Sequence, residues 1–81
     1  PAATPSAMSE SDKVDQFIRE MKLADARKTA VASLAKEPKN ADLLARYSRV
    51  LVLTGDQEKN KDAQLGLYEK ARAQADQAIQ A

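Results

Sequence analysis

Two stretches of the chain repeat the same spacing of small side chains. Each stretch has three small residues followed by a larger aliphatic one, at offsets of 0, 4, 7 and 8, and the second stretch lies 45 residues after the first. A helix with small residues at this spacing presents a flat face onto which another helix packs closely. We therefore expect two helix-packing faces in one layered helical domain. The two sets are Ala26, Ala30, Ser33 and Leu34, and Ala71, Ala75, Ala78 and Ile79.

Hydrophobic periodicity predicts two helices in the first half of the chain. The first covers about residues 11–22, because apolar residues recur at i, i+3, i+4 and i+7 from Val14 onward. The second covers about residues 24–36, and Pro38 ends it because proline disfavours the α conformation in the residue before it. The residues expected on the inner face of this second helix are Leu23, Ala26, Ala30, Val31 and Leu34.

Two more helices are expected in the second half. The third begins after Asn40, whose side chain caps it, and ends at Gly55, which suits a left-handed C-cap. The fourth begins near Asn60 or Lys61 and runs toward the end of the chain. No strand pattern occurs, so we predict an all-α fold of about four antiparallel helices. The inner face of the fourth helix is expected to carry Leu65, Tyr68, Ala71, Ala75, Ala78 and Ile79.

The first residues of the chain show none of these patterns. Residues 1–7 are rich in proline, alanine and serine, and we expect the natural start at Met8. We predict a disordered N-terminal segment over residues 1–10 and a single helical domain over residues 11–81. Its core is expected to be thin, because 16 of the 81 residues are alanine and only three are aromatic.

Composition excludes several classes of function. The chain has no cysteine and no histidine, so it lacks thiolate metal ligands and the commonest general base. Its two glycines are eleven residues apart, which excludes a glycine-rich phosphate loop. We therefore expect no enzyme, no catalytic or metal-binding residues and no cofactor. The net charge of +1 argues against a nucleic-acid partner. No apolar run approaches the roughly 20 residues of a membrane helix, so we expect no membrane contact and a cytoplasmic location.

The spacing of small residues resembles the tetratricopeptide repeat. That repeat has small residues at these offsets on the second helix of each pair, and a proline follows shortly afterwards. Residues 25–34 and Pro38 fit this pattern. The usual period is about 34 residues, so about 11 additional residues must lie between Asp56 and Leu67. The usual early tryptophan is replaced by Leu44. The resemblance implies an antiparallel helix-pair stack.

Two segments also resemble the regulator of microtubule dynamics family. They are residues 42–49, with the sequence DLLARYSR, and residues 67–71, with the sequence LYEKA, separated by a long charged connection. The family's domains are considerably longer, so the resemblance implies that the chain is an N-terminal fragment of a longer solenoid. It also implies association with microtubules and the spindle, and a role in chromosome segregation.

The candidate partner contacts are basic and aromatic side chains. Arg46 and Arg49 lie three residues apart, and a pair of guanidinium groups suits a partner's carboxylate. The alternative is that Arg46 pairs with Asp42 one turn away. The basic residues of the first half suit tubulin's acidic surface, although the carboxylates between them are also typical of an ordinary solvated face. These basic residues are Lys13, Arg19, Lys22, Arg27, Lys28, Lys36 and Lys39. The candidate set is Arg46, Arg49, Tyr47, Lys28, Lys36 and Lys39.

Two functions therefore stay open. The chain is expected to be an interaction module that binds tubulin, or a tetratricopeptide scaffold that receives a partner helix or peptide tail without any role at tubulin. Such stacks usually need about three repeats. We therefore also expect self-association, or contact with further repeats, through an apolar face that the last helix leaves exposed.

Overall fold

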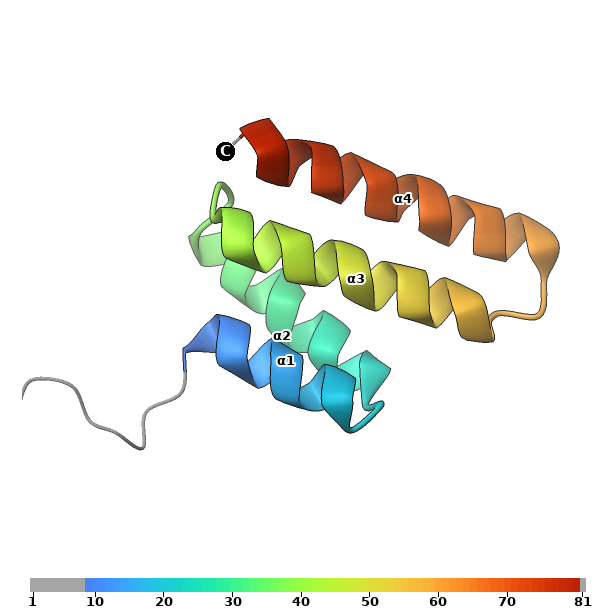
Figure 1. Cartoon of the computed structure of the whole chain (residues 1–81), viewed down its shortest axis with the longest axis horizontal. Helices are drawn as coiled ribbons and strands as arrows, with labels where there is room; N and C mark the ends of the chain where they lie inside the picture. The colour runs from blue at the N-terminus through green and yellow to red at the C-terminus, as the bar shows by residue number, and fades with distance from the viewer. Residues whose placement is uncertain (1–8, 81) are drawn as a thin grey trace, which may run out of the picture.

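The structure is a computed structural model that describes residues 9–80. Its helices are α1 (Glu10–Arg19), α2 (Leu23–Lys36), α3 (Ala41–Gln57) and α4 (Lys61–Gln80) (Figure 1). No strand occurs within residues 9–80, and the predicted all-α fold with about four helices is confirmed. Of the N-terminal segment predicted to be disordered, residues 1–8 lie outside the described residues. Ser9 and Glu10, in contrast, form the start of α1.

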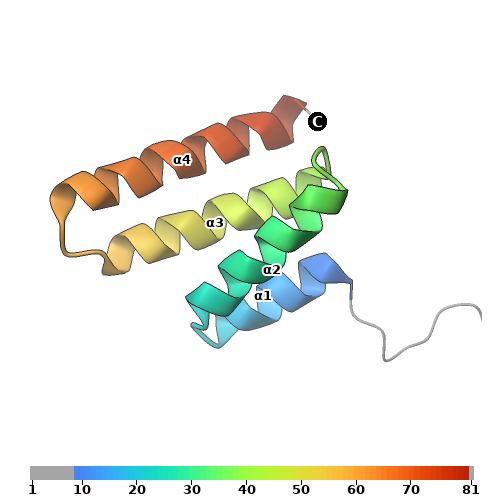
Figure 2. The ribbon, with the colours of Figure 1, turned by 180° about the vertical axis from the view of Figure 1, so that it is seen from behind.

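The helices form two antiparallel pairs. α1 packs against α2, α3 packs against α4, and α3 also contacts both helices of the first pair. Figures 1 and 2 show α3 in the middle, with α4 along one side and the α1–α2 pair along the other. Within the described part of the chain, α4 packs against α3 and against no other helix. The fold is therefore built around α3.

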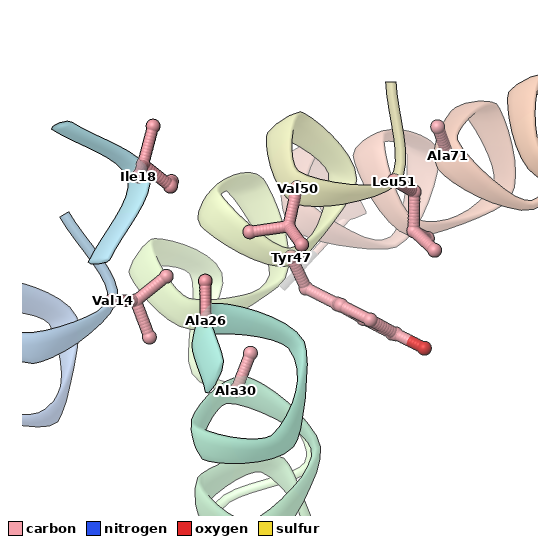
Figure 3. Packing of buried hydrophobic residues seen from close by; sticks show 8 residues of the cluster. All are labelled: Val14, Ile18, Ala26, Ala30, Tyr47, Val50, Leu51 and Ala71. Carbon is pink, nitrogen blue, oxygen red and sulfur yellow. The ribbon is translucent and has the colours of Figure 1, made fainter. Parts of the chain in front are cut away.

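All four helices contribute to one hydrophobic core (Figure 3). Its centre is formed by α3, where Val50 and Leu51 are completely buried. Val14 of α1 is also completely buried, whereas α2 and α4 contribute only alanines to this cluster. Small side chains at these positions allow a neighbouring helix to pack closely. The buried members of the cluster are Val14, Ile18, Ala26, Ala30, Tyr47, Val50, Leu51 and Ala71.

The first predicted packing face is found at a helix interface. Ala26 and Ala30 are fully buried, Ser33 is buried, and Leu34 packs against the core. Since α2 is in contact with both α1 and α3, a broad stripe of its surface is covered.

Ser33 has a second role, because it ties α2 to the start of α1. Its hydroxyl donates a hydrogen bond to Glu10 Oε2 at 3.0 Å. This hydrogen bond, together with the nearby Lys13 ammonium, lowers the pKa of Glu10 from its ordinary value. A hydroxyl therefore serves at this position in a way that alanine could not.

The second predicted packing face is only partly covered. Ala71 is buried, and Ala75 and Ala78 are half-buried. The prediction for Ile79 is wrong, because this side chain is 83% exposed. A residue eight positions after Ala71 is turned by about 80° around the helix, and α4 has only α3 against it to cover such a position. The prediction that Leu65 faces inward is wrong for the same reason, since it is 57% exposed.

The end of α1 differs from the prediction. The helix ends at Arg19, and Met21 lies in the left-handed region with a φ of 57°. The Met21 N–H donates to the Ile18 carbonyl at 3.0 Å, and the Lys22 N–H donates to the Phe17 carbonyl at 2.8 Å. These two bonds form a Schellman motif, which usually has glycine at the left-handed position. Because methionine stands there instead, no residue type marks this helix boundary.

Replacing Met21 with glycine should raise the free energy of unfolding by up to about 1 kcal/mol. A left-handed conformation costs an L-residue about 1–2 kcal/mol, and the greater freedom of glycine in the unfolded chain offsets part of this gain. The Met21 side chain is 53% exposed, so little packing is lost. Chemical denaturation measures the effect, and Met21→Ala, which keeps the strain, serves as the control. A glycine variant no more stable than the alanine variant would contradict this account.

The two ends of α3 show one correct and one wrong prediction. Asn40 caps the helix as predicted, because its Oδ1 accepts a hydrogen bond from the Leu43 N–H at 3.2 Å. Gly55 is not the C-cap, since α3 continues through it to Gln57 and its φ is not positive. Gly55 is buried, and a Cβ atom there would lie 2.7 Å from Tyr68 Cε1. The glycine therefore lets α3 and α4 approach each other.

Candidate functional site between α2, α3 and α4

An open groove lies where α2 diverges from the α3–α4 pair. Its volume is about 870 Å³. One wall is formed by two rows of α2 residues spaced four apart, which lie side by side along that helix. These rows are Leu23, Arg27 and Val31, and Ala24, Lys28 and Ala32. The remaining lining residues are Tyr47, Thr54 and Gln57 of α3 and Lys70 of α4. We call this surface the basic groove.

Apolar side chains form the inner part of the basic groove. Tyr47 is 6% exposed and Leu23 is 7% exposed, so both belong to the packed interior as well as to the groove. Figure 3 shows the Tyr47 ring directed away from Val14 and Ile18. Val31 was predicted to face inward, and this is wrong because its side chain is 47% exposed at the groove. The groove therefore offers a partly open apolar surface.

The charges of the basic groove have one sign. Among residues 9–80, Arg27, Lys28 and Lys70 line it and no carboxylate does. None of these three cations forms an ion pair with a carboxylate within residues 9–80. The Lys70 Nζ lies 5.9 Å from the centroid of the Tyr47 ring, in a cation–π position. Cations of one sign around a concave surface raise the local concentration of acidic partners.

The residues predicted as partner contacts do not lie together. Tyr47 and Lys28 line the basic groove. Lys36 lies at the far end of α2, beside Glu10 and Ser33. Lys39 lies in the connection between α2 and α3, against the end of α4. Only two of the six predicted contacts therefore belong to the groove.

The two predicted arginines lie on the side of α3 that packs toward α1. Arg46 Nε is 3.0 Å from Asp15 Oδ1, and Arg46 Nη1 donates to the Asp42 carbonyl oxygen at 3.2 Å. The Nε is buried but not aligned for a hydrogen bond, so we describe the Asp15 contact as an ion pair between α3 and α1. Arg49 lines a separate shallow depression of about 300 Å³, together with Arg19. The predicted pair of arginines for a partner's carboxylate is therefore not found in the groove.

The comparisons with known proteins found no match. No protein family, curated protein or solved structure matches the chain. The resemblance to the regulator of microtubule dynamics family stays a prediction that rests on the residues quoted for it, and the same holds for the tetratricopeptide assignment.

Three important groove residues were not among the six predicted contacts, although Arg27 belongs to the basic patch expected in the first half. They are Arg27, Val31 and Lys70. A usable signal was nevertheless present, because each of them is the sequence neighbour of a buried alanine at position 26, 30 or 71. A residue next to a packing stripe lies at the rim of that stripe. Such rims form a groove wherever two packed helices diverge.

The described residues contain neither a metal site nor a membrane helix. Within residues 9–80, no three histidine, cysteine, aspartate or glutamate side chains converge on a point where an ion could bind. Among the four helices, none is both long and apolar enough to span a bilayer.

Proposed function

We propose that this protein is a protein–protein interaction module that binds its partner in the basic groove. The observation that carries the proposal is a groove of about 870 Å³ whose lining residues within 9–80 include three cations, an exposed valine and no carboxylate. A surface of this kind suits an acidic partner that also carries apolar side chains. The helix pairs act as a tetratricopeptide-like scaffold that holds the two walls apart.

The partner that the sequence resemblance supplies is tubulin. In this proposal the basic groove contacts the acidic surface of microtubules, and the protein acts at the spindle in microtubule regulation and chromosome segregation. Contacts between exposed charges are screened over about 8 Å at physiological ionic strength. Binding to microtubules should therefore weaken steeply as salt is added. The alternative is a scaffold that receives the helix or tail of another acidic protein in the same groove.

Reversing two groove charges, with Arg27→Glu and Lys70→Glu, should weaken microtubule binding about tenfold or more, which corresponds to about 1.4 kcal/mol. Both side chains are exposed, so the fold should persist, as circular dichroism can verify. The measurement is co-sedimentation of the full chain with polymerised microtubules over a series of salt concentrations.

The matched control reverses two cations that the sequence predicted as contacts but that lie outside the groove, with Lys36→Glu and Lys39→Glu. This variant has the same net charge as the groove variant and should bind nearly as well as the wild type. Equal losses in the two variants would mean that net charge alone governs binding. If the wild type does not co-sediment even at low salt, the tubulin role is excluded and the alternative scaffold function is favoured.

A further inference from the structure

We infer that the basic groove binds its partner as a short acidic amphipathic helix rather than as an extended segment. This inference rests on the proposed interaction function and specifies the form of the ligand. It follows from the secondary structure of the walls, from the spacing of the α2 rows and from the position of the charges.

The walls of the groove favour a helical ligand. They are formed by α2, α3 and α4, and in a helix only the first N–H groups and the last C=O groups lack a partner within the helix. An extended peptide binds well where a sheet edge offers a continuous row of free backbone groups, and helical walls offer no such row. A polyproline segment needs a groove lined by several aromatic rings, whereas Tyr47 is the one aromatic residue in the described part of the chain that lines this groove. A helix satisfies its own backbone and presents only side chains.

The two rows on α2 fit the surface of another helix. They span Leu23 to Ala32, which corresponds to about 14 Å along the helix axis. Rows of residues spaced four apart are the ridges between which the side chains of a neighbouring helix insert. A ligand of about three turns covers this length, with apolar side chains at i, i+4 and i+7. We expect those side chains to contact Val31 and Tyr47.

The charges define the flanks of the ligand. Arg27 and Lys28 lie on the α2 wall and Lys70 on the α4 wall, so cations face the ligand from both sides. A helix whose apolar stripe has carboxylates along both edges pairs with both walls at once. Arg27 offers a planar set of donors for such a carboxylate. A carboxylate near Lys70 would provide an ion pair in addition to the contact that this lysine makes with the Tyr47 ring.

The test uses synthetic peptides and the isotope-labelled full chain. The probe is a peptide of about 12 residues, roughly three turns, with leucines at i, i+4 and i+7 and glutamates on both sides of them. A second version carries a side-chain staple on its solvent face, a third has proline at its centre, and a fourth has lysine in place of every glutamate. NMR titration reports the affinity of each peptide and the residues whose signals move.

The acidic peptide should move the signals of Arg27, Val31, Tyr47 and Lys70. Because an isolated helix of this length is marginal in water, stapling should tighten binding, whereas the proline and lysine versions should bind about tenfold more weakly or worse. The inference is overturned if the proline version binds as well as the parent peptide, if no signal moves at millimolar peptide, or if the shifts map to Arg19 and Arg49 instead.

A pair of valine variants locates the site independently. Val31→Asp should weaken binding of the acidic peptide about tenfold, whereas Val52→Asp, at a 39% exposed position of α3 outside the groove, should leave the affinity unchanged. Sedimentation equilibrium tests whether a second copy of the chain occupies the groove instead. If the wild type is a dimer and Val31→Asp dissociates it, the groove binds a second copy and the inference is overturned. Microtubule binding without peptide binding would remove this inference and keep the proposed function. Peptide binding without microtubule binding would remove only the tubulin partner.

Discussion

Truncating Leu51 to alanine should lower the free energy of unfolding by about 2–5 kcal/mol, the usual range for a buried leucine. Leu51 is completely buried in the middle of α3, the one helix that contacts all the others. The buried members of the core cluster that α2 and α4 contribute are alanines, whose side chains are too short to extend into the cavity. A domain of this size has a total stability of about 4–12 kcal/mol. The loss is therefore a large share of the whole.

Urea denaturation followed by circular dichroism measures the effect. The matched control is Val52→Ala, the next residue of the same helix, which is 39% exposed and should cost less than about 1 kcal/mol. If Leu51→Ala lowers the free energy of unfolding no more than Val52→Ala does, α3 is not the centre of the core.

The two glycines should respond to alanine in opposite directions. Both lie within helices, where alanine is favoured over glycine by about 1 kcal/mol. Within residues 9–80, no atom other than those of its chain neighbours and its own helix backbone lies within 4 Å of a Cβ atom placed at Gly66, so Gly66→Ala should stabilise the protein by about this amount. At Gly55 the new methyl group would lie 2.7 Å from Tyr68 Cε1 and 3.1 Å from its Cδ1. Overpacking of this kind costs about 1–3 kcal/mol, so Gly55→Ala should destabilise the protein.

The Tyr68 ring cannot easily move away from such a methyl group. Its hydroxyl donates a hydrogen bond to Asp56 Oδ1 at 2.5 Å, which also raises the pKa of Tyr68 from its ordinary value. A double-mutant cycle isolates the steric effect. In the background of Tyr68→Ala, Gly55→Ala should become stabilising, as at Gly66. If Gly55→Ala stays destabilising without the ring, the close approach of Tyr68 is not the reason for the glycine.

The features that the sequence predicted correctly are those decided by near neighbours. Asn40 caps α3 because its side chain reaches an N–H only three residues away. The packing face of α2 was recognisable because Ala26, Ala30 and Ser33 follow the helical period and two other helices cover that face. In these cases local chemistry and tertiary structure favour the same arrangement.

The features that were predicted wrongly depend on residues far along the chain. A glycine near a helix end can serve as a left-handed C-cap or can let another helix pack closely. At Gly55 the second role applies, because Tyr68 of the next helix lies where a Cβ atom would be. Met21 adopts a left-handed conformation because the chain must turn before α2, and the residue type gives no warning. Ile79 follows the small-residue pattern, but only one helix covers α4.

The candidate site was predicted only in part. Its basic and aromatic character was expected, and Tyr47 and Lys28 were named. Arg46 has the right chemistry, but its ion pair with Asp15 places it at the interface with α1. The position of a groove depends on where packed helices diverge. The angle between those helices is set by tertiary packing and cannot be derived from local sequence patterns.

Because α4 packs against α3 alone within residues 9–80, the protein can lose α4 from the fold without unfolding the other three helices. Detaching α4 would break the α3–α4 interface, the most extensive between any two helices here, and would leave the contacts among α1, α2 and α3 in place. Since α4 supplies Lys70, a molecule with α4 detached has only part of its binding surface. The observed affinity for any ligand of the groove is then the intrinsic affinity multiplied by the fraction of molecules in which α4 is docked. Substitutions at the α3–α4 contact, far from the ligand, would therefore change affinity through that fraction alone.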